Sequence, residues 1–218
     1  MNALECYDVT KTYDRFSLNR ISFSVPRGCV VGLIGENGAG KSTTLKSVLD
    51  LIHIDSGEIL LFGQPHTSHN GALREAVGAV FEDFNFPSYL HAGSISHIMR
   101  HIYQTWDDNL FQSYLVQFAL PPDKLVKHFS RGMKMKLSIA AALAHRPSLL
   151  ILDEATSGLD PIMRDEMLDA FLEFVQEANH SILLSSHITS DLEKVADYIT
   201  FIHNGKLIMT CLLYTSDA

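Results

Sequence analysis

The chain has 218 residues, of which 46% are hydrophobic and 19% are charged, and its net charge is −8. This is the balance of an ordinary globular protein with a sizeable core. The negative charge argues against a nucleic-acid-binding surface, because phosphate backbones are bound by clustered Lys and Arg. The sequence has no apolar stretch long enough to cross a membrane and no signal peptide. We therefore expect a cytoplasmic protein that reaches a membrane only through a partner.

The cysteines agree with a cytosolic location. Cys6, Cys29 and Cys211 are scattered and odd in number, which fits a reducing compartment and no disulfide framework. We interpret them as small buried side chains.

The first third of the chain is predicted to be rich in strands. Residues 4–9 and 21–25 alternate in the manner of half-buried strands and are followed by a turn at residues 26–28. An apolar strand at residues 29–34 leads into a helix at residues 43–49. A further β pair is expected at residues 57–63.

The middle of the chain changes to helical spacing, and strand signals then return. Residues 87–146 carry two apolar stripes, interrupted by Pro121 and Pro122. The pattern predicts strands at residues 149–152, 181–185, 198–202 and 206–209, with a helix between the first two. The helical stripes are Ile95, Ile98, Met99 and Ile102, then Leu110, Tyr114, Leu115 and Phe118.

This order of elements predicts one α/β domain over residues 1–210, with a mostly parallel sheet covered by helices on both faces. Residues 1–86 and 147–210 form the β and phosphate-loop core, which begins with an antiparallel β subdomain. Residues 87–146 form an inserted helical subdomain. Residues 211–218 resemble a translated library-adapter sequence and are expected to be non-native, the alternative being a native final strand.

The most informative motif is the phosphate loop at residues 35–42, which fits G-x-x-x-x-G-K-[ST] between a predicted strand and a predicted helix. Its glycines allow the backbone to wrap round a polyphosphate, and the following helix adds the positive end of its dipole. Lys41 is expected to reach the β- and γ-phosphates and Ser42 to bind Mg²⁺. A glycine-rich turn that only caps a helix is the alternative. The predicted nucleotide-binding residues here are Gly35, Asn37, Gly38, Ala39, Gly40, Lys41, Ser42 and Thr43.

A pair of acidic residues follows the apolar strand at residues 149–152. Asp153 and Glu154 leave the carboxyl end of that strand, on the side where the phosphate loop opens. A carboxylate in this place can hold Mg²⁺, and its neighbour can polarise the attacking water. A solvated loop end is the other interpretation of an isolated Asp-Glu pair.

Taken together, the motifs resemble the ATP-binding subunit of ABC transporters, over residues 4–209. Residues 129–133 are similar to the family's signature sequence and residues 157–160 to its D-loop. His187 is similar to its switch histidine and Tyr13 to the aromatic residue that stacks on adenine. Tyr13 could equally pack below the sheet as an ordinary strand residue.

The resemblance implies a head-to-tail dimer, of identical or different ATPase subunits, with two ATP molecules in the interface. Ser130 and Gly132 would complete the partner's site at the γ-phosphate, and Asp160 would lie beside the nucleotide. Glu154 would be the general base and His187 would position water next to it. A separate membrane permease would dock on the helical subdomain and residues 83–91, which places the subunit on the inner face of the membrane.

The sequence departs from the family pattern at three positions. Glu82 stands where the family has Gln, and we expect it to assist Ser42 and Asp153 as a metal ligand, although it could simply point to solvent. Arg131 stands where the family has Gly, and Met133 where it has Gln. The Ser-Arg-Gly-Met variant is also similar to ATPases of bacterial drug, antibiotic-peptide and bacitracin-type exporters. A non-transport ABC ATPase acting on DNA or ribosomes is the alternative function, and the acidity of the chain disfavours it.

Overall fold

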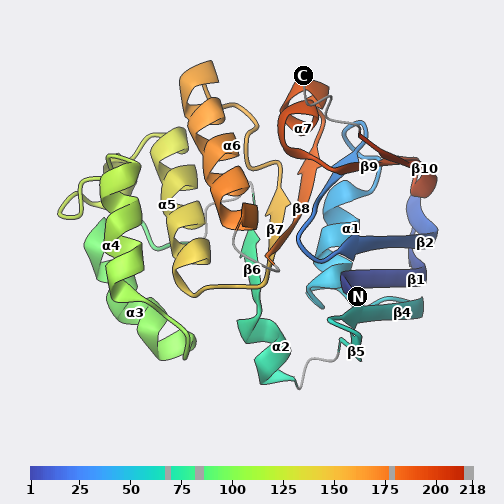
Figure 1. The fold of residues 1–218 in the computed structure, drawn as a ribbon. Helices are drawn as coiled ribbons and strands as arrows, with labels where there is room; N and C mark the ends of the chain where they lie inside the picture. The colour runs from blue at the N-terminus through green and yellow to red at the C-terminus, as the bar shows by residue number, and fades with distance from the viewer. Residues whose placement is uncertain (67–69, 82–85, 177–179, 214–218) are drawn as a thin grey trace.

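The structure, a computed structural model, describes residues 1–66, 70–81, 86–176 and 180–213 and contains two β-sheets (Figure 1). The smaller sheet is antiparallel, with strand order β2-β1-β4-β5. Its strands are β1 (Asn2–Tyr13), β2 (Phe16–Pro26), β4 (Ser56–Leu61) and β5 (Gln64–Pro65). The predicted antiparallel β subdomain is therefore confirmed.

The larger sheet has the order β10-β9-β3-β8-β7-β6, and all of its neighbouring strands are parallel except β9 and β10. Parallel neighbours end at the same edge, so the segments that follow β3, β7 and β8 meet there. The strands are β3 (Val30–Ile34), β6 (Val77–Val80), β7 (Leu149–Asp153), β8 (Ser181–Ser186), β9 (Tyr198–His203) and β10 (Lys206–Leu212).

Helices cover both faces of the larger sheet (Figure 1). Helix α1 (Lys41–Val48) lies between the two sheets, whereas α5 (Arg131–Ala144), α6 (Pro161–Gln176) and α7 (Thr189–Val195) lie on the other face. Helices α3 (Ile95–Ile102) and α4 (Asp108–Gln117) pack outside α5. The short elements are α2 (Gly71–Glu75) and two 3₁₀ turns, Ala92–Ser94 and Val126–His128.

The central strands are apolar on both sides, as is typical of parallel strands buried between layers. Val31, Leu33 and Leu183 belong to the core shared with α1 and the smaller sheet. Val30 and Leu184 belong to the core shared with α5, α6 and α7. This double burial explains why these strands read as continuous apolar runs in the sequence.

A small set of contacts joins the segment between α3 and α4 to the end of α5 and to the residues before β6. The Thr105 hydroxyl lies 2.6 Å from the His145 carbonyl oxygen and 3.0 Å from Glu75 Oε2. The rings of Tyr103 and His145 stack with centroids 4.0 Å apart. Burial alone would raise the pKa of Glu75, but N–H donors from Gln104 and Thr105 hold it below its ordinary value.

The structure differs from the sequence expectations in three details. Ile98 and Ile102 are 40% and 60% exposed, because α3 lies at the surface and buries only Ile95 fully. Cys6 is buried, and burial raises the pKa of its thiol, whereas Cys29 and Cys211 are only half-buried. Strand β10 continues beyond residue 210 to Leu212, and residues 214–218 lie outside the described residues. Among the described helices, none is long and apolar enough to cross a bilayer.

Candidate active site

The phosphate loop connects β3 to α1 with a backbone that only glycine adopts readily. Gly38 and Gly40 have φ values of +82° and +114°. A Cβ on Gly40 would also lie 2.9 Å from the Phe16 ring and 2.8 Å from the Leu18 side chain. Both glycines are therefore required by the loop itself, and the end of the β1–β2 hairpin packs directly against it.

Lys41 is the first residue of α1 and is only 5% exposed. Its Nζ donates to the carbonyl oxygens of Gly35 at 2.7 Å and Glu36 at 3.3 Å. The same nitrogen lies 3.1 Å from Glu154 Oε1. The lysine is thus folded back over its own loop, with its charge facing the acidic residue that follows β7.

Asp153 and Glu154 lie at the carboxyl end of β7, as predicted, and both are buried. The Ser185 hydroxyl, on the neighbouring strand β8, donates to Asp153 Oδ1 at 2.6 Å. The Ser185 Oγ in turn accepts a hydrogen bond from the Glu154 N–H at 3.1 Å. Glu154 has φ +52°, so the chain turns sharply here and directs its side chain back toward the phosphate loop.

His187 follows β8 and meets Glu154 across the same edge of the sheet. Its Nδ1 lies 2.7 Å from Glu154 Oε2. With Glu154 ionised, Nδ1 is the donor, which leaves Nε2 for another partner. The His187 side chain is 42% exposed, so the imidazole lies between the buried carboxylate and solvent.

The signature residues lie at the N-terminus of α5. Ser130 is the N-cap, because its Oγ accepts from the Met133 N–H at 3.2 Å, an arrangement worth about 1 kcal/mol of helix stability. Gly132 packs against Leu159 and Met163, and a Cβ in its place would collide with the Met163 sulfur. The Arg131 guanidinium covers Gly158. The signature therefore rests on the D-loop of its own chain.

Asp160 and Tyr13 are placed where they serve the fold as well. Asp160 Oδ1 accepts from the Met163 N–H at 3.1 Å and so caps the first turn of α6. Tyr13 ends β1, pairs with Phe16 across the hairpin and is 45% exposed. Phe16, which was not singled out in the sequence, is the aromatic residue that touches Gly40. Glu82 lies outside the described residues.

The donors near the phosphate loop fit Mg²⁺. Ser42 follows Lys41 in the first turn of α1, and Asp153 presents a buried carboxylate whose Oδ1 is held by Ser185. Within the described residues no group of three His, Cys, Asp or Glu side chains could hold a metal. Mg²⁺ needs no such group, because it is commonly held by one or two protein oxygens together with phosphates and water.

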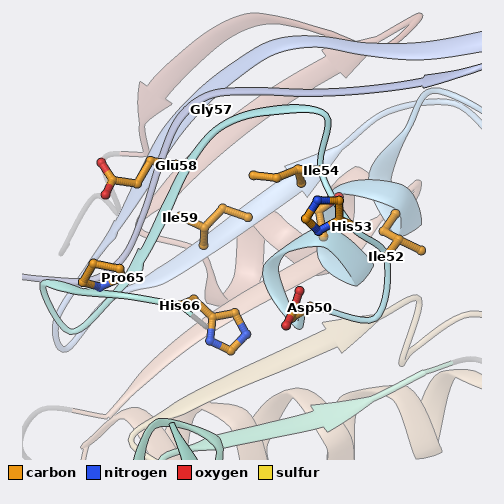
Figure 2. A pocket seen from close by; sticks show the side chains of 10 residues that line it. Asp50, Ile52, His53, Ile54, Gly57, Glu58, Ile59, Pro65 and His66 are labelled. Carbon is orange, nitrogen blue, oxygen red and sulfur yellow. The ribbon is translucent and has the colours of Figure 1, made fainter. Parts of the chain in front are cut away.

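A separate cavity of about 320 Å³ lies at the opposite end of α1 (Figure 2). It is lined by Ser47 and Asp50, by Ile52, His53 and Ile54 in the loop after α1, and by residues of β4 and β5 up to His66. Burial lowers the pKa of His66. Because the phosphate loop is at the other end of the helix, this cavity is not part of the active-site group.

The structure thus brings Lys41, Asp153, Glu154 and His187 together at one edge of the sheet. Ser130, Gly132 and Asp160 form a second group around the D-loop. Sequence analysis missed Ser185, whose hydroxyl contacts both Asp153 and the Glu154 N–H. A signal was available for Ser185, since it directly follows the apolar run at residues 182–184, near the carboxyl end of β8.

Comparison with known proteins gives a consistent result. Residues 18–157 match the family model described as "ABC transporter". The bacitracin transport ATP-binding protein BcrA of Bacillus licheniformis is 38% identical over 92% of the chain and 67% of the relative. The lantibiotic transport ATP-binding protein SrtF of Streptococcus pyogenes is 36% identical over 94% of the chain and 89% of the relative.

Solved structures agree with these relatives. The ATP-binding subunit of an ABC transporter superposes with a TM-score of 0.88 at 29% identity, over 97% of this chain and 90% of the other. A dimeric ATP-binding cassette in a post-hydrolysis state, bound to ADP and phosphate, gives a TM-score of 0.87 over 97% and 99% of the two chains. At 20% identity the second match shows the fold alone.

Proposed function

This chain belongs to the ABC transporter family, in which it is an ATP-binding, ATP-hydrolysing subunit, and we propose that Glu154 is its general base within a site shared by two subunits. The observation that carries the proposal is the double contact of Glu154. Its Oε1 lies 3.1 Å from Lys41 and its Oε2 lies 2.7 Å from His187. One carboxylate therefore joins the phosphate loop to the residue after the neighbouring strand.

The chain's own groups account for phosphate binding. The loop backbone and the N-terminus of α1 favour an anion, and Lys41 adds a full positive charge. Ser42 and Asp153 are proposed to hold Mg²⁺, with Glu82 as a further ligand. Bound there, the ion would neutralise charge that develops on the phosphates.

Glu154 is positioned to take the proton of the attacking water. As the water oxygen bonds to the γ-phosphorus, the bond to the β,γ-bridging oxygen breaks and ADP leaves, while the water proton passes to a Glu154 oxygen. His187 holds Glu154 in place through Nδ1 and keeps Nε2 available for the γ-phosphate.

The signature is proposed to act on the partner's nucleotide, together with Asp160 of the D-loop. Ser130 and Gly132 stand at the N-terminus of a fourteen-residue helix whose dipole favours an anion. Within its own chain this end contacts the D-loop. A head-to-tail dimer would place it against the other subunit's phosphates, with Tyr13 beside adenine.

A mixing experiment tests the shared site. A Lys41→Ala subunit and a Ser130→Arg subunit are each expected to be inactive, because each spoils both sites of its own homodimer. A mixed dimer has one site with both defects and one with neither, so activity should partly return. Ser113→Arg, which changes an exposed serine on α4, is the matched control and should retain activity alone. Mixtures that form heterodimers yet remain inactive would contradict the shared site.

We further propose that hydrolysis drives a separate membrane permease that moves a peptide antibiotic. The relatives' names, bacitracin transport and lantibiotic transport, support this substrate class. A groove of about 330 Å³ suits an apolar segment of the permease, since it lies between the end of α1, β6 and Tyr103. It opens beside Phe81, the residue before Glu82. Its apolar lining is Leu49, Leu51, Leu61, Val77, Ala79 and Phe81.

The groove is tested with Leu51, which is 61% exposed in the loop after α1. Leu51→Glu should preserve the ATPase activity of the isolated subunit and abolish its stimulation by the partner permease. Val116→Glu, at an 81% exposed apolar residue on α4, is the control and should preserve both activities. Normal stimulation of Leu51→Glu would exclude this docking site.

A further inference from the structure

Glu154 and His187 contact each other, and a second hydrogen bond joins the same two chain segments a few residues after each of them. The Thr156 hydroxyl donates to Asp191 Oδ2 at 2.7 Å. Thr156 lies two residues after Glu154, and Asp191 lies four residues after His187 in the first turn of α7. Thr156 is 0% exposed and Asp191 is 2% exposed, so this bond is fully shielded from water.

This bond is the last of three that connect the same two segments in order. Ser185 donates to Asp153, His187 to Glu154, and Thr156 to Asp191, at 2.6, 2.7 and 2.7 Å. The middle bond contains the two groups assigned to catalysis. The outer two bonds hold the middle pair from both sides.

Asp191 also reaches the D-loop through Arg164 on α6. Its Oδ1 lies 3.8 Å from Arg164 Nη1, and Arg164 Nη2 donates to the Leu159 carbonyl at 3.3 Å. Leu159 in turn packs against Gly132 of the signature. The buried carboxylate therefore links the switch segment to the D-loop and, through it, to the signature.

An acid in this place is costly to the fold, because a buried charge loses its hydration. The hydrogen bond from the Thr156 hydroxyl and the ion pair with Arg164 offset that cost, and they do so only while both groups keep their positions. The carboxylate consequently fixes the relative positions of three elements: the turn after β7, the first turns of α6 and the first turn of α7.

We propose that Asp191 is a positioning residue for ATP hydrolysis, acting through Thr156 and Arg164 to hold Glu154 and the D-loop in register with His187. The inference rests on the roles proposed above for Glu154 and His187. Displacing a catalytic group by about 1 Å can cost on the order of 10²-fold in rate, so loss of this clamp should appear in turnover.

The test compares hydroxyl-keeping and hydroxyl-lacking variants at residue 156 in the full chain. Thr156→Val has nearly the same shape without the donor, and Thr156→Ser keeps the donor. We expect Thr156→Val to lower kcat about tenfold or more with KM for ATP within about twofold of the parent, and Thr156→Ser to restore most of kcat. Asp191→Asn should lower kcat likewise, because it removes the charge that holds Arg164.

The chain offers a matched control on the same two helices. Asp165 on α6 and Lys194 on α7 form an exposed ion pair at 2.6 Å. Asp165→Asn breaks a link between α6 and α7 with the same chemical change as Asp191→Asn, and it should leave kcat and KM unchanged. Thermal melting of each protein establishes that it is folded at the assay temperature.

Each outcome decides the inference. Thr156→Val with parental kcat, or Thr156→Ser as slow as Thr156→Val, would overturn it. An equal loss of kcat in Asp165→Asn would also overturn it, because any contact between α6 and α7 would then suffice. A Glu154→Gln protein with full activity would remove the proposed base instead, a result distinct from the behaviour of the residue 156 pair.

Discussion

Two regions beside the larger sheet are held together by different kinds of contact: the edge after β7 and β8, and the contacts next to β6. At the carboxyl ends of β7 and β8, three short hydrogen bonds connect the two segments, and every side chain in them except His187 is buried. Next to β6, the segment between α3 and α4 is attached to the residues after α5 by the ring stack of Tyr103 on His145, by Thr105 and by an ion pair between Asp107 and Arg146.

The two kinds of contact differ in how much stability is lost when one partner is removed. Removing one partner of a buried hydrogen bond lowers stability strongly, because the remaining group stays desolvated and unpaired. Ring stacking and exposed ion pairs lose less, because water can replace their polar contacts. We infer that the edge of the sheet after β7 and β8 demands one geometry, whereas the attachment of the segment between α3 and α4 tolerates change. The following predictions test this contrast.

The largest effect is expected at Glu154. Glu154→Gln removes the base but keeps the size of the side chain, so turnover should fall by roughly 10²-fold or more while nucleotide binding persists. Steady-state turnover and equilibrium ATP binding measure the two quantities separately. Glu173→Gln, at an exposed residue of α6, is the control and should behave as the parent. Near-parental hydrolysis by Glu154→Gln would remove it from the mechanism.

A smaller effect is expected at Glu82, which follows β6 in the sequence. A carboxylate binds Mg²⁺ better than an amide but adds negative charge near a triphosphate. Glu82→Gln should keep turnover within about tenfold, a barrier change of ~1.4 kcal/mol, and should raise the Mg²⁺ concentration needed for half-maximal rate. Glu82→Ala should lose more. Identical Mg²⁺ curves for the three proteins would exclude a role at the metal.

The attachment of the segment between α3 and α4 should be sensitive to pH through His145. Burial lowers the pKa of this imidazole, although Glu75 nearby favours its charged form. The unfolded chain therefore takes up the proton first as pH falls below about 6.5, and the free energy of unfolding decreases from there toward the folded pKa. His145→Gln should flatten this dependence in melting curves collected over that range. An unchanged slope would show that another group, such as His66, whose pKa burial also lowers, is responsible.

The smallest effect is expected at the exposed ion pair. Arg146 Nη2 lies 2.7 Å from Asp107 Oδ2, and the arginine side chain is 63% exposed. Arg146→Ala should shift the melting temperature by about 2 °C or less, because solvent screens such pairs. Breaking the buried Thr156 bond with Thr156→Val should shift it more. If Arg146→Ala melts at least as early as Thr156→Val, the contrast between the two regions is wrong.

Local chemistry in the sequence was sufficient for the main architecture and for part of the site. The phosphate loop is a contiguous motif whose glycines and lysine are set by backbone geometry and charge. Asp153 and Glu154 follow a continuous apolar run, and such a run predicts a buried strand with its carboxyl end at the site. The change from strand to helical spacing after residue 86 also marked the helical subdomain.

The supporting contacts depended on the tertiary structure alone. Ser185 meets Asp153 because β7 and β8 pair in one particular parallel register, and both strands are apolar on both faces, so their sequences do not specify it. Thr156 and Asp191 come together because α7 returns over the turn after β7, which no periodicity encodes. The sequence by itself supplied the groups that we propose bind phosphate and move a proton. Only the packing of segments more than thirty residues apart decided what holds those groups in place.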